Sequence, residues 1–172
     1  MNNPVTRHTL SVLVENTPGV LSQVSRLFSR KGYNIESLAV GTTDDPEVSR
    51  ITIEVTCDNL MIEQIINQLR KLFCVYSVRL LPPASSIRRE LVLIKVKAEG
   101  RDVRNEVIQI ANIFRATIID VSTKSLTLAV IGQESKDDAL EKLLCEFGIL
   151  ELVRTGMVAL ERGEATINDN DA

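Results

Sequence analysis

Residues 9–42 read TLSVLVENTPGVLSQVSRLFSRKGYNIESLAVGT, and two hydrophobic periods follow one another in this stretch. Leu10, Val12 and Val14 recur at every second position, which predicts a strand with one buried face. The apolar residues of 20–28 recur at helical spacing after Pro18, so a helix is predicted to begin there. The β-rich run 34–42 then predicts a second strand.

The remainder of the first half continues the alternation of strand and helix patterns. Residues 49–56 form another β-rich run, and the turn formers at 44–46 precede it, as in a hairpin with a longer loop. Asp58 or Asn59 is a suitable cap for a second helix, and residues 75–80 supply a last strand. The predicted order is therefore βαββαβ.

A second half with the same order follows a linker. The sequence PPASS at 82–86 suits neither helix nor sheet. The elements predicted beyond it are a strand at 90–97, a helix capped by Asp102, two strands around 123–124, a helix opened by Ser135 and closed by Gly148, and a strand at 149–155. We therefore predict an α+β protein of two ferredoxin-like domains, each a four-stranded antiparallel sheet with two helices on one face.

The helix-free face of each predicted sheet carries apolar residues. Leu13 in the first half, and Leu91 and Leu93 in the second, stand where a solvated face would be polar. A second copy of the chain, paired sheet to sheet or edge to edge, would cover them, so we expect at least a dimer.

Composition argues against nucleic acid as a partner. The chain has 172 residues and a net charge of −3, and its 20 basic residues are scattered. Aromatic residues make up 3% and Trp is absent, so stacking platforms are mostly missing. Neither a basic stripe nor an aromatic pair on central strands supports binding of DNA or RNA.

Cysteine usage and hydropathy indicate an intracellular protein. Cys57, Cys74 and Cys145 are far apart and lack CxxC spacing, so we expect reduced thiols that behave as small apolar groups. There is no signal peptide pattern and no apolar stretch of membrane-spanning length. We expect a cytoplasmic location, or the plastid stroma if a transit peptide has been removed.

Catalytic and metal sites find no support in the sequence. His8 is the only histidine, and no Ser or Cys lies in a recognisable nucleophile motif. Asp44, Asp45 and Glu47 lack the spacing and glycine of a calcium loop, so we expect a solvated turn. No catalytic residue and no metal ligand is therefore assigned.

The junction ENTPGVL at 15–21 is the strongest candidate for a small-molecule site. Unpaired amides at a helix start favour an anion such as a carboxylate. Gly19 lets a ligand approach the backbone, and Asn16 supplies an amide group. The alternative is an ordinary helix start capped by Thr17 or Asn16.

A family resemblance extends this interpretation. The stretch ENTPGVLSQVSRLFSRKGYNIESLAVGTTDDPEVSRITI at 15–53 resembles the amino-terminal ACT domain of the acetolactate synthase (acetohydroxyacid synthase) small-subunit family. RELVLIKV, IFRATIIDVS and RTGMVALERG are similar to that family's carboxy-terminal domain. The resemblance covers nearly all of the chain up to Gly163.

The resemblance implies a non-catalytic regulatory subunit. Such a subunit enhances a large catalytic subunit and makes it sensitive to feedback inhibition by valine, or by leucine or isoleucine. The family's effector lies where two ACT domains of a homodimer meet. The matching positions here are Asn16, Pro18, Gly19, Val20 and Leu21 from one copy and Asn34 and Ile35 from the other. Thiamine diphosphate, Mg²⁺ and FAD are expected on the catalytic subunit, and no cofactor on this chain.

The sequence thus predicts four segments and leaves alternatives open. The segments are residues 5–81 as an ACT regulatory domain, 82–89 as a linker, 90–163 as the carboxy-terminal ferredoxin-like domain and 164–172 as a disordered tail. A free-standing ACT-repeat sensor that controls a different enzyme is the main alternative. A small ferredoxin-like hydrolase is a second one, which turnover by the isolated chain would reveal.

Overall fold

The computed structural model describes residues 4–169. The chain divides into two compact units, Met1–Arg88 with Met157–Ala172 and Arg89–Gly156, called here the first and the second unit. Both combine helices with an antiparallel sheet, as the sequence predicts. Within the described part of the chain, no helix is long and apolar enough to cross a membrane.

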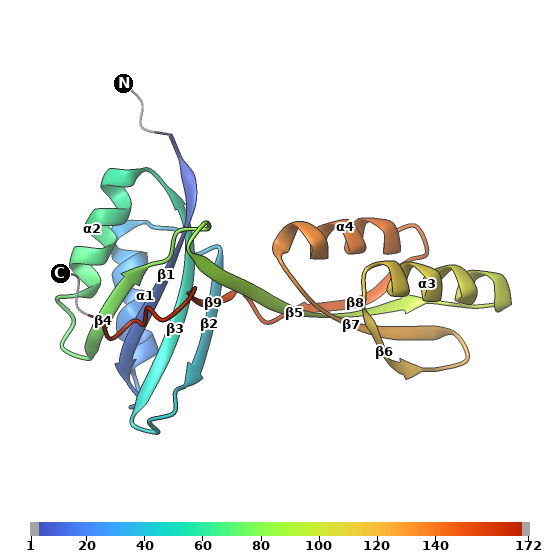
Figure 1. Ribbon diagram of the computed structural model, residues 1–172, viewed down its shortest axis with the longest axis horizontal. Helices are drawn as coiled ribbons and strands as arrows, with labels where there is room; N and C mark the ends of the chain where they lie inside the picture. Colours follow the sequence, from blue (N-terminus) through green and yellow to red (C-terminus); the bar gives the residue numbers. More distant parts are fainter. Residues whose placement is uncertain (1–3, 170–172) are drawn as a thin grey trace. The chain divides into compact units, whose positions relative to one another are not determined.

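The first unit has the predicted βαββαβ order (Figure 1). Its elements are β1 (Thr6–Glu15), α1 (Val20–Lys31), β2 (Ser37–Thr42), β3 (Val48–Cys57), α2 (Asn59–Leu69) and β4 (Val75–Leu80). The strands pair antiparallel in the order β2-β3-β1-β4, so β2 is an edge strand. Asp58, one of the two predicted caps, accepts a hydrogen bond from Met61 N at 2.8 Å and begins α2.

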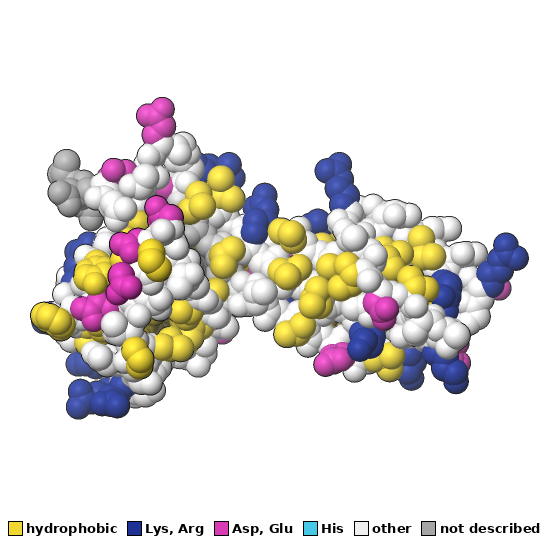
Figure 2. All heavy atoms as spheres, turned by 90° about the horizontal axis from the view of Figure 1, so that it is seen from below, with side chains coloured by type: hydrophobic (Ala, Val, Ile, Leu, Met, Phe, Trp, Pro, Cys, Tyr) yellow, Lys and Arg dark blue, Asp and Glu magenta, His cyan; other side chains and the backbone are white. Residues whose placement is uncertain are grey.

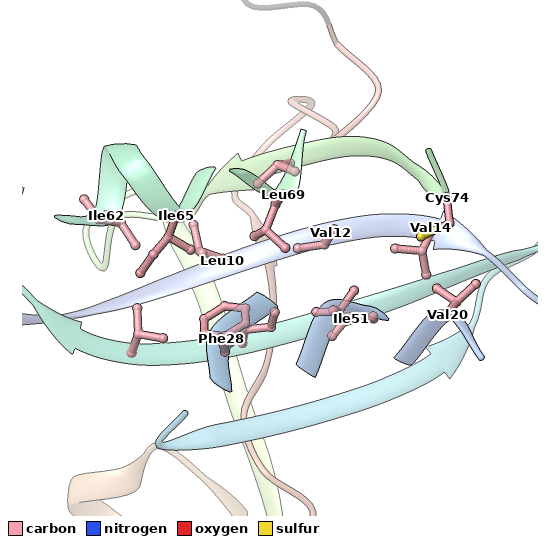
Figure 3. Close-up of a cluster of buried hydrophobic side chains, with 14 of the residues drawn as sticks. Leu10, Val12, Val14, Val20, Phe28, Ile51, Ile62, Ile65, Leu69 and Cys74 are labelled. Atoms are coloured by element: carbon pink, nitrogen blue, oxygen red, sulfur yellow. The ribbon is translucent and has the colours of Figure 1, made fainter. Parts of the chain in front are cut away.

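One face of β1 forms the centre of the first core. Leu10, Val12 and Val14 are each at most 1% exposed. Phe28 of α1 and Ile65 of α2 belong to the same cluster (Figure 3). The predicted period-two pattern is therefore confirmed, and it selects the face of the sheet that the helices cover.

The other face of this sheet is covered by the end of the chain. We call residues 157–169, which include β9 (Val158–Glu161), the return segment. Ser77 Oγ donates a hydrogen bond to Ile167 O at 3.0 Å, and Arg79 Nη2 donates one to Thr166 O at 2.9 Å. Leu13 on this face is only 7% exposed. The expectation that a second copy covers Leu13 is therefore wrong, because the chain covers it itself.

The return segment also changes two expected boundaries. Residues 164–169, expected to be disordered, lie against β4, and Ile167 is buried there; residues 170–172 lie outside the described residues. One buried side chain and a few carbonyl acceptors hold this part, and neither makes a periodic pattern in the sequence. Residues 157–163, expected in the carboxy-terminal domain, group with the first unit.

The expected linker at 82–89 is partly regular structure. Strand β5 (Ser86–Lys97) begins inside it. Ser86 is buried, and its hydroxyl donates a hydrogen bond to Pro82 O at 2.7 Å. The two prolines therefore lie in a turn that the Ser86 hydroxyl closes, and β5 starts at Ser86.

The second unit repeats the order of elements around its own core. Besides β5 it contains α3 (Arg101–Ile113), β6 (Thr117–Val121), β7 (Ser125–Gly132), α4 (Glu134–Leu144) and β8 (Ile149–Arg154). The strand order is β6-β7-β5-β8, and β9 pairs with β5 off this path. Val92, Ile94 and Val96 of β5 are fully buried against the two helices. The ferredoxin-like prediction is thus confirmed for both halves.

The two predicted helix caps of the second unit are wrong. Gly100 precedes α3 without a side-chain cap, and Asp102 lies in the first turn instead. Helix α4 begins at Glu134, so Ser135 is already inside it. Asp and Ser suit both the cap and the first turn, and sequence alone did not separate these positions.

The helix-free face of the second unit is apolar and partly open, as the sequence predicts for Leu91 and Leu93. The register places Leu91 opposite Ile131 and Leu93 opposite Val153. Ile131 is 65% exposed and Val153 55% exposed. Figure 2 shows hydrophobic side chains gathered on this unit.

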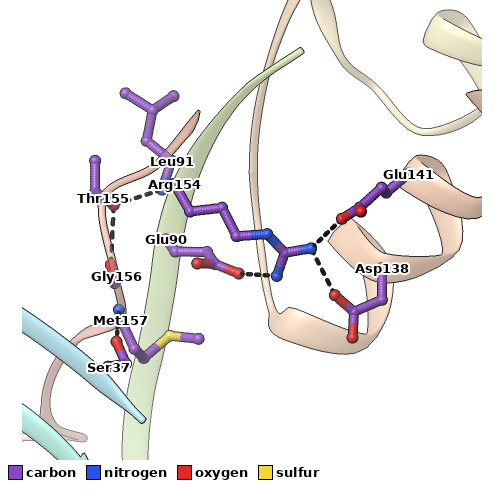
Figure 4. A network of polar contacts seen from close by, with 9 residues as sticks. All are labelled: Ser37, Glu90, Leu91, Asp138, Glu141, Arg154, Thr155, Gly156 and Met157. Carbon is purple, nitrogen blue, oxygen red and sulfur yellow. Dashed lines mark hydrogen bonds and ion pairs between the residues drawn. The ribbon is translucent and has the colours of Figure 1, made fainter. Parts of the chain in front are cut away.

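An ionic cluster joins α4 to two strands of the second unit (Figure 4). Arg154 Nη1 lies 3.1 Å from Glu90 Oε1, and Arg154 Nη2 lies 2.6 Å from Asp138 Oδ1 and 2.7 Å from Glu141 Oε2. Burial lowers the pKa of Arg154, but the hydrogen bonds that Arg154 donates to Asp138 and Glu141 outweigh this effect and raise its pKa. Arg154 is therefore a permanent cation that holds three carboxylates together.

Candidate functional site

The loop that joins β1 to α1 leaves the start of the helix open. Gly19 is the N-cap residue, with φ 90° and ψ −11°, and no side chain caps the helix. A Cβ at Gly19 would meet nothing within 4 Å. The backbone at this position has a left-handed conformation, which glycine adopts without steric cost. The space around Gly19 leaves room for another molecule.

Backbone donors point out of this helix start. The amides of Gly19, Leu21 and Ser22 have no hydrogen-bond partner within residues 4–169, whereas Gln23 N donates to Gly19 O at 3.0 Å. Free amides of the first turn and the helix dipole together favour a negative group. The predicted anion-accepting character of this loop therefore has a geometric basis.

Asn16 has a different role from the capping alternative. Its Nδ2 donates a hydrogen bond to Pro46 O at 2.7 Å, and its Oδ1 accepts one from Ser49 Oγ at 3.0 Å. Thr17 does not cap α1 either, because its hydroxyl contacts Glu15 Oε2 at 3.5 Å. The side chain of Asn16 ties the loop to the β2–β3 hairpin, and the second N–H of its Nδ2 has no partner among residues 4–169.

The sequence did not identify the two residues that hold Asn16. Pro46 was expected only to form a turn, and Ser49 was assigned only to a strand. The register pairs Ser49 with Val14, two residues before Asn16. The sequence signal for this contact is the Ser49 hydroxyl near the start of β3 and the Asn16 side-chain amide just after the end of β1, its neighbouring strand.

The neighbouring residues provide an apolar wall and an anchor. Val20 is 4% exposed and belongs to the first core, so it fixes the first turn of α1. Leu21 is 43% exposed, and Pro18 is also exposed. The free amides of the first turn of α1 thus lie beside an exposed aliphatic side chain.

Asn34 and Ile35 lie at the opposite end of α1. Asn34 Nδ2 donates a hydrogen bond to Glu36 Oε1 at 3.0 Å, and Ile35 packs against the first core. The 12 residues of α1 span roughly 18 Å. Within one chain, the structure therefore brings together Asn16–Leu21 but does not bring Asn34 and Ile35 to them.

Residues that sequence reasoning set aside have ordinary surroundings. His8 Nε2 lies 3.2 Å from Cys57 O on neighbouring strands. Burial raises the pKa of the Cys57 and Cys74 thiols, which keeps both protonated. Asp45 Oδ1 accepts a hydrogen bond from Glu47 N, as in a turn. Over the described residues, no group of three His, Cys, Asp or Glu side chains could hold a metal ion.

Comparison with known families places both halves of the chain. Residues 10–77 match the family described as the AHAS small subunit-like ACT domain. Residues 89–163 match the family described as the small subunit of acetolactate synthase.

Two relatives match nearly from end to end. A probable acetolactate synthase small subunit of Methanothermobacter thermautotrophicus is 48% identical over 160 residues, which is 93% of this chain and 95% of the relative. The acetolactate synthase small subunit of Mycolicibacterium smegmatis is 47% identical over 163 residues, which is 95% of each chain.

A crystal structure has the same fold. The small subunit of acetolactate synthase from Thermotoga maritima superposes with a TM-score of 0.86 at 39% sequence identity. The superposition covers 93% of this chain and 99% of that one. The similarity thus includes both units.

Proposed function

Because the chain belongs to the acetolactate synthase small-subunit family, we propose that it is the regulatory subunit of an acetolactate synthase. In this role it enhances a larger catalytic subunit and makes the enzyme sensitive to feedback inhibition by valine or another branched-chain amino acid. The observation that carries the proposal is the 48% identity to a small subunit over 93% of this chain. Bacterial and archaeal relatives support a cytoplasmic location.

The effector site of this proposal is the open start of α1. A branched-chain amino acid carries a carboxylate, an ammonium group and an aliphatic side chain. The free amides of Gly19, Leu21 and Ser22 suit the carboxylate, and the exposed side chain of Leu21 suits the aliphatic group. Asn16, Pro18 and Val20 hold the loop in position.

The rest of the site comes from a second copy in this proposal. Asn34 and Ile35 are roughly 18 Å away along α1 in the same chain, so they complete the site only if another copy presents them. The edge strand β2 supports such a pairing, because its outer edge is unpaired within the described residues and Val40 is 48% exposed. A two-fold axis beside β2 would form two equivalent sites per homodimer.

A site shared between copies explains how binding reaches a partner. The effector stabilises one arrangement of the two copies over others, and only this difference in affinity shifts an equilibrium. The large catalytic subunit, to which we assign thiamine diphosphate, Mg²⁺ and FAD, responds to that arrangement. We assign no cofactor to this chain.

Reconstitution tests the proposal. The purified chain is mixed with the large subunit encoded in the same organism, and acetolactate formation is measured with and without valine, leucine and isoleucine. We expect the chain to raise turnover and at least one of the three amino acids to lower it. No stimulation and no inhibition by any of them would refute the regulatory role.

Two controls separate the alternatives. Calorimetry on the chain alone shows whether it binds branched-chain amino acids. If the chain binds them but does not co-purify with the large subunit, a sensor that controls a different enzyme is favoured. The chain alone should show no turnover of acyl or phosphoryl ester substrates. Turnover by the chain alone would favour the small ferredoxin-like hydrolase instead.

A further inference from the structure

A cavity lies on the side of the first sheet that faces away from the helices. Its volume is about 780 Å³, and the helix-free face of β1, β3 and β4 forms its floor. The return segment and the β2–β3 turn form its walls. None of the residues assigned to the effector site lines it. Its volume is in the range of small-molecule sites.

The floor of the cavity carries a cation with free hydrogen-bond donors. Arg50 of β3 is half-buried, and its Nε donates a hydrogen bond to Ser11 Oγ at 2.7 Å. The two terminal nitrogens of Arg50 have no partner within residues 4–169. Burial lowers the pKa of Arg50, and nearby Glu161 partly offsets this. A guanidinium that is fixed at Nε and free at both terminal nitrogens suits a bidentate carboxylate.

The wall of the cavity carries an unsatisfied anion. Glu161 Oε1 lies 3.9 Å from Arg79 Nη1, but Glu161 Oε2 is buried without a hydrogen-bond partner. Neither a hydrogen bond nor an ion pair joins Glu161 to Arg50. A buried carboxylate oxygen without a partner is costly, so a rotation of the Glu161 side chain that turns the carboxylate toward the cavity and a ligand ammonium group would be favoured.

The remaining lining decides between ligand classes. Asp44, Asp45 and Glu164 make the rim acidic, which disfavours a bare carboxylate and favours a ligand with a positive group. Leu13, Val48 and Leu160 supply an apolar surface. The cavity thus offers a cation, an anion and an aliphatic wall together.

We propose that this cavity is a second ligand site and binds the zwitterion of an aliphatic α-amino acid. The ligand carboxylate pairs with the terminal nitrogens of Arg50, and the ammonium group pairs with the Glu161 carboxylate after its side chain turns toward the cavity. The side chain lies against Leu13 and Leu160. The site lies within one chain, so it does not require the homodimer or the effector site at α1.

A titration of the full-length chain, observed by its backbone amide NMR signals, tests the site. The probes are L-leucine, 4-methyl-2-oxopentanoate, which lacks the ammonium group, and isopentylamine, which lacks the carboxylate. We expect leucine to shift the signals of Arg50, Leu160 and Ile167 with saturation. Each truncated probe should bind there about 10–100-fold more weakly. Equal binding of either truncated probe, or no leucine shift at these positions, overturns the proposal.

Matched variants complete the test. Arg50→Met should weaken leucine binding at the cavity signals by about 10–100-fold, and Glu161→Gln by about tenfold. Arg30→Met, on the exposed last turn of α1, should leave it unchanged. Signals of Gly19 and Asn34 report the effector site in the same titration, so each site fails or succeeds separately. Unchanged cavity binding in Arg50→Met, with the remaining spectrum intact, refutes the assignment.

Discussion

Gly132 lies directly against the carboxyl group of Asp137, and a Cβ at Gly132 would stand 2.3 Å from Asp137 Oδ1. Both residues are buried, so neither side can move away freely. We expect Gly132→Ala to lower the free energy of unfolding by about 1–3 kcal/mol, because it overpacks the second unit. Urea unfolding measures this change. In an Asp137→Ser background the same substitution should cost much less, and an equal cost in both backgrounds would argue against the contact.

Asp137 should make the second unit less stable as pH rises. The residue is fully buried, and neither carboxyl oxygen has a hydrogen-bond partner. Burial raises the pKa of Asp137, and Lys136 and Arg154 oppose this rise only in part. The folded chain therefore holds this proton more tightly than the unfolded chain. The stabilisation is complete below the ordinary pKa of 3.8 and is lost as pH rises through the raised pKa.

Asp137→Asn tests this dependence because its amide cannot ionise. We expect the variant to be about 1–3 kcal/mol more stable than the parent at neutral pH and to lose this advantage in acid. The measurement is the free energy of unfolding at several pH values for both proteins. A difference that does not change with pH would show that ionisation of Asp137 is not the cause.

Asn16 should stabilise the loop even without a ligand. Asn16→Ala removes the bonds to Pro46 O and Ser49 Oγ, and we expect a loss of about 1–2 kcal/mol in urea unfolding. Ser49→Ala removes one of them and should cost about half as much. In the double variant the two losses should not add, because both single variants break the same bond. Strict additivity would contradict the link between the two side chains.

Gly19→Asp and Asn34→Ala should weaken the valine response without unfolding the protein. The new carboxylate at Gly19 repels a ligand carboxylate, and we expect at least about tenfold weaker valine affinity by calorimetry. Gly19→Asn is the control, since it tests the left-handed conformation without the charge. If either Gly19→Asp or Asn34→Ala leaves the assembled enzyme fully valine-sensitive, the effector site is wrongly placed.

Ile167 should hold the return segment against the first sheet. Ile167→Ala is expected to lower the free energy of unfolding by about 1–2 kcal/mol, less than in a central core position because Ile167 is still 8% exposed. Faster amide exchange of Ser77 and Arg79 should accompany it. Val158→Ala, at a half-exposed position of the same segment, is the control and should have little effect.

The hydrophobic period predicted most of the fold because it is a local property. The alternation of Leu10, Val12 and Val14 and the helical spacing up to Phe28 each need only neighbouring residues, and both were confirmed. The return segment was missed because its contacts join residues about 90 positions apart, such as Ser77 and Ile167.

The candidate site could be predicted only in part for a similar reason. A glycine after Pro18 at a helix start suggests open amides, and the structure has them. The partners of Asn16 lie in the β2–β3 turn and in β3, so no local sequence pattern indicates them. Arg50 and Glu161 lie 111 positions apart and meet only at the cavity, which the sequence alone did not suggest.

The first unit is built from two separate stretches of the chain, and this affects how the protein folds during synthesis. All four strands of its sheet precede the second unit in the chain, but the segment that covers the helix-free face includes Ile167, which follows that unit. The second unit is encoded entirely within this interval, so it has left the ribosome before the first unit is complete. A nascent chain therefore exposes Leu13 and its neighbours until residues 157–169 have followed the second unit out of the ribosome, and chaperones have that time to bind them.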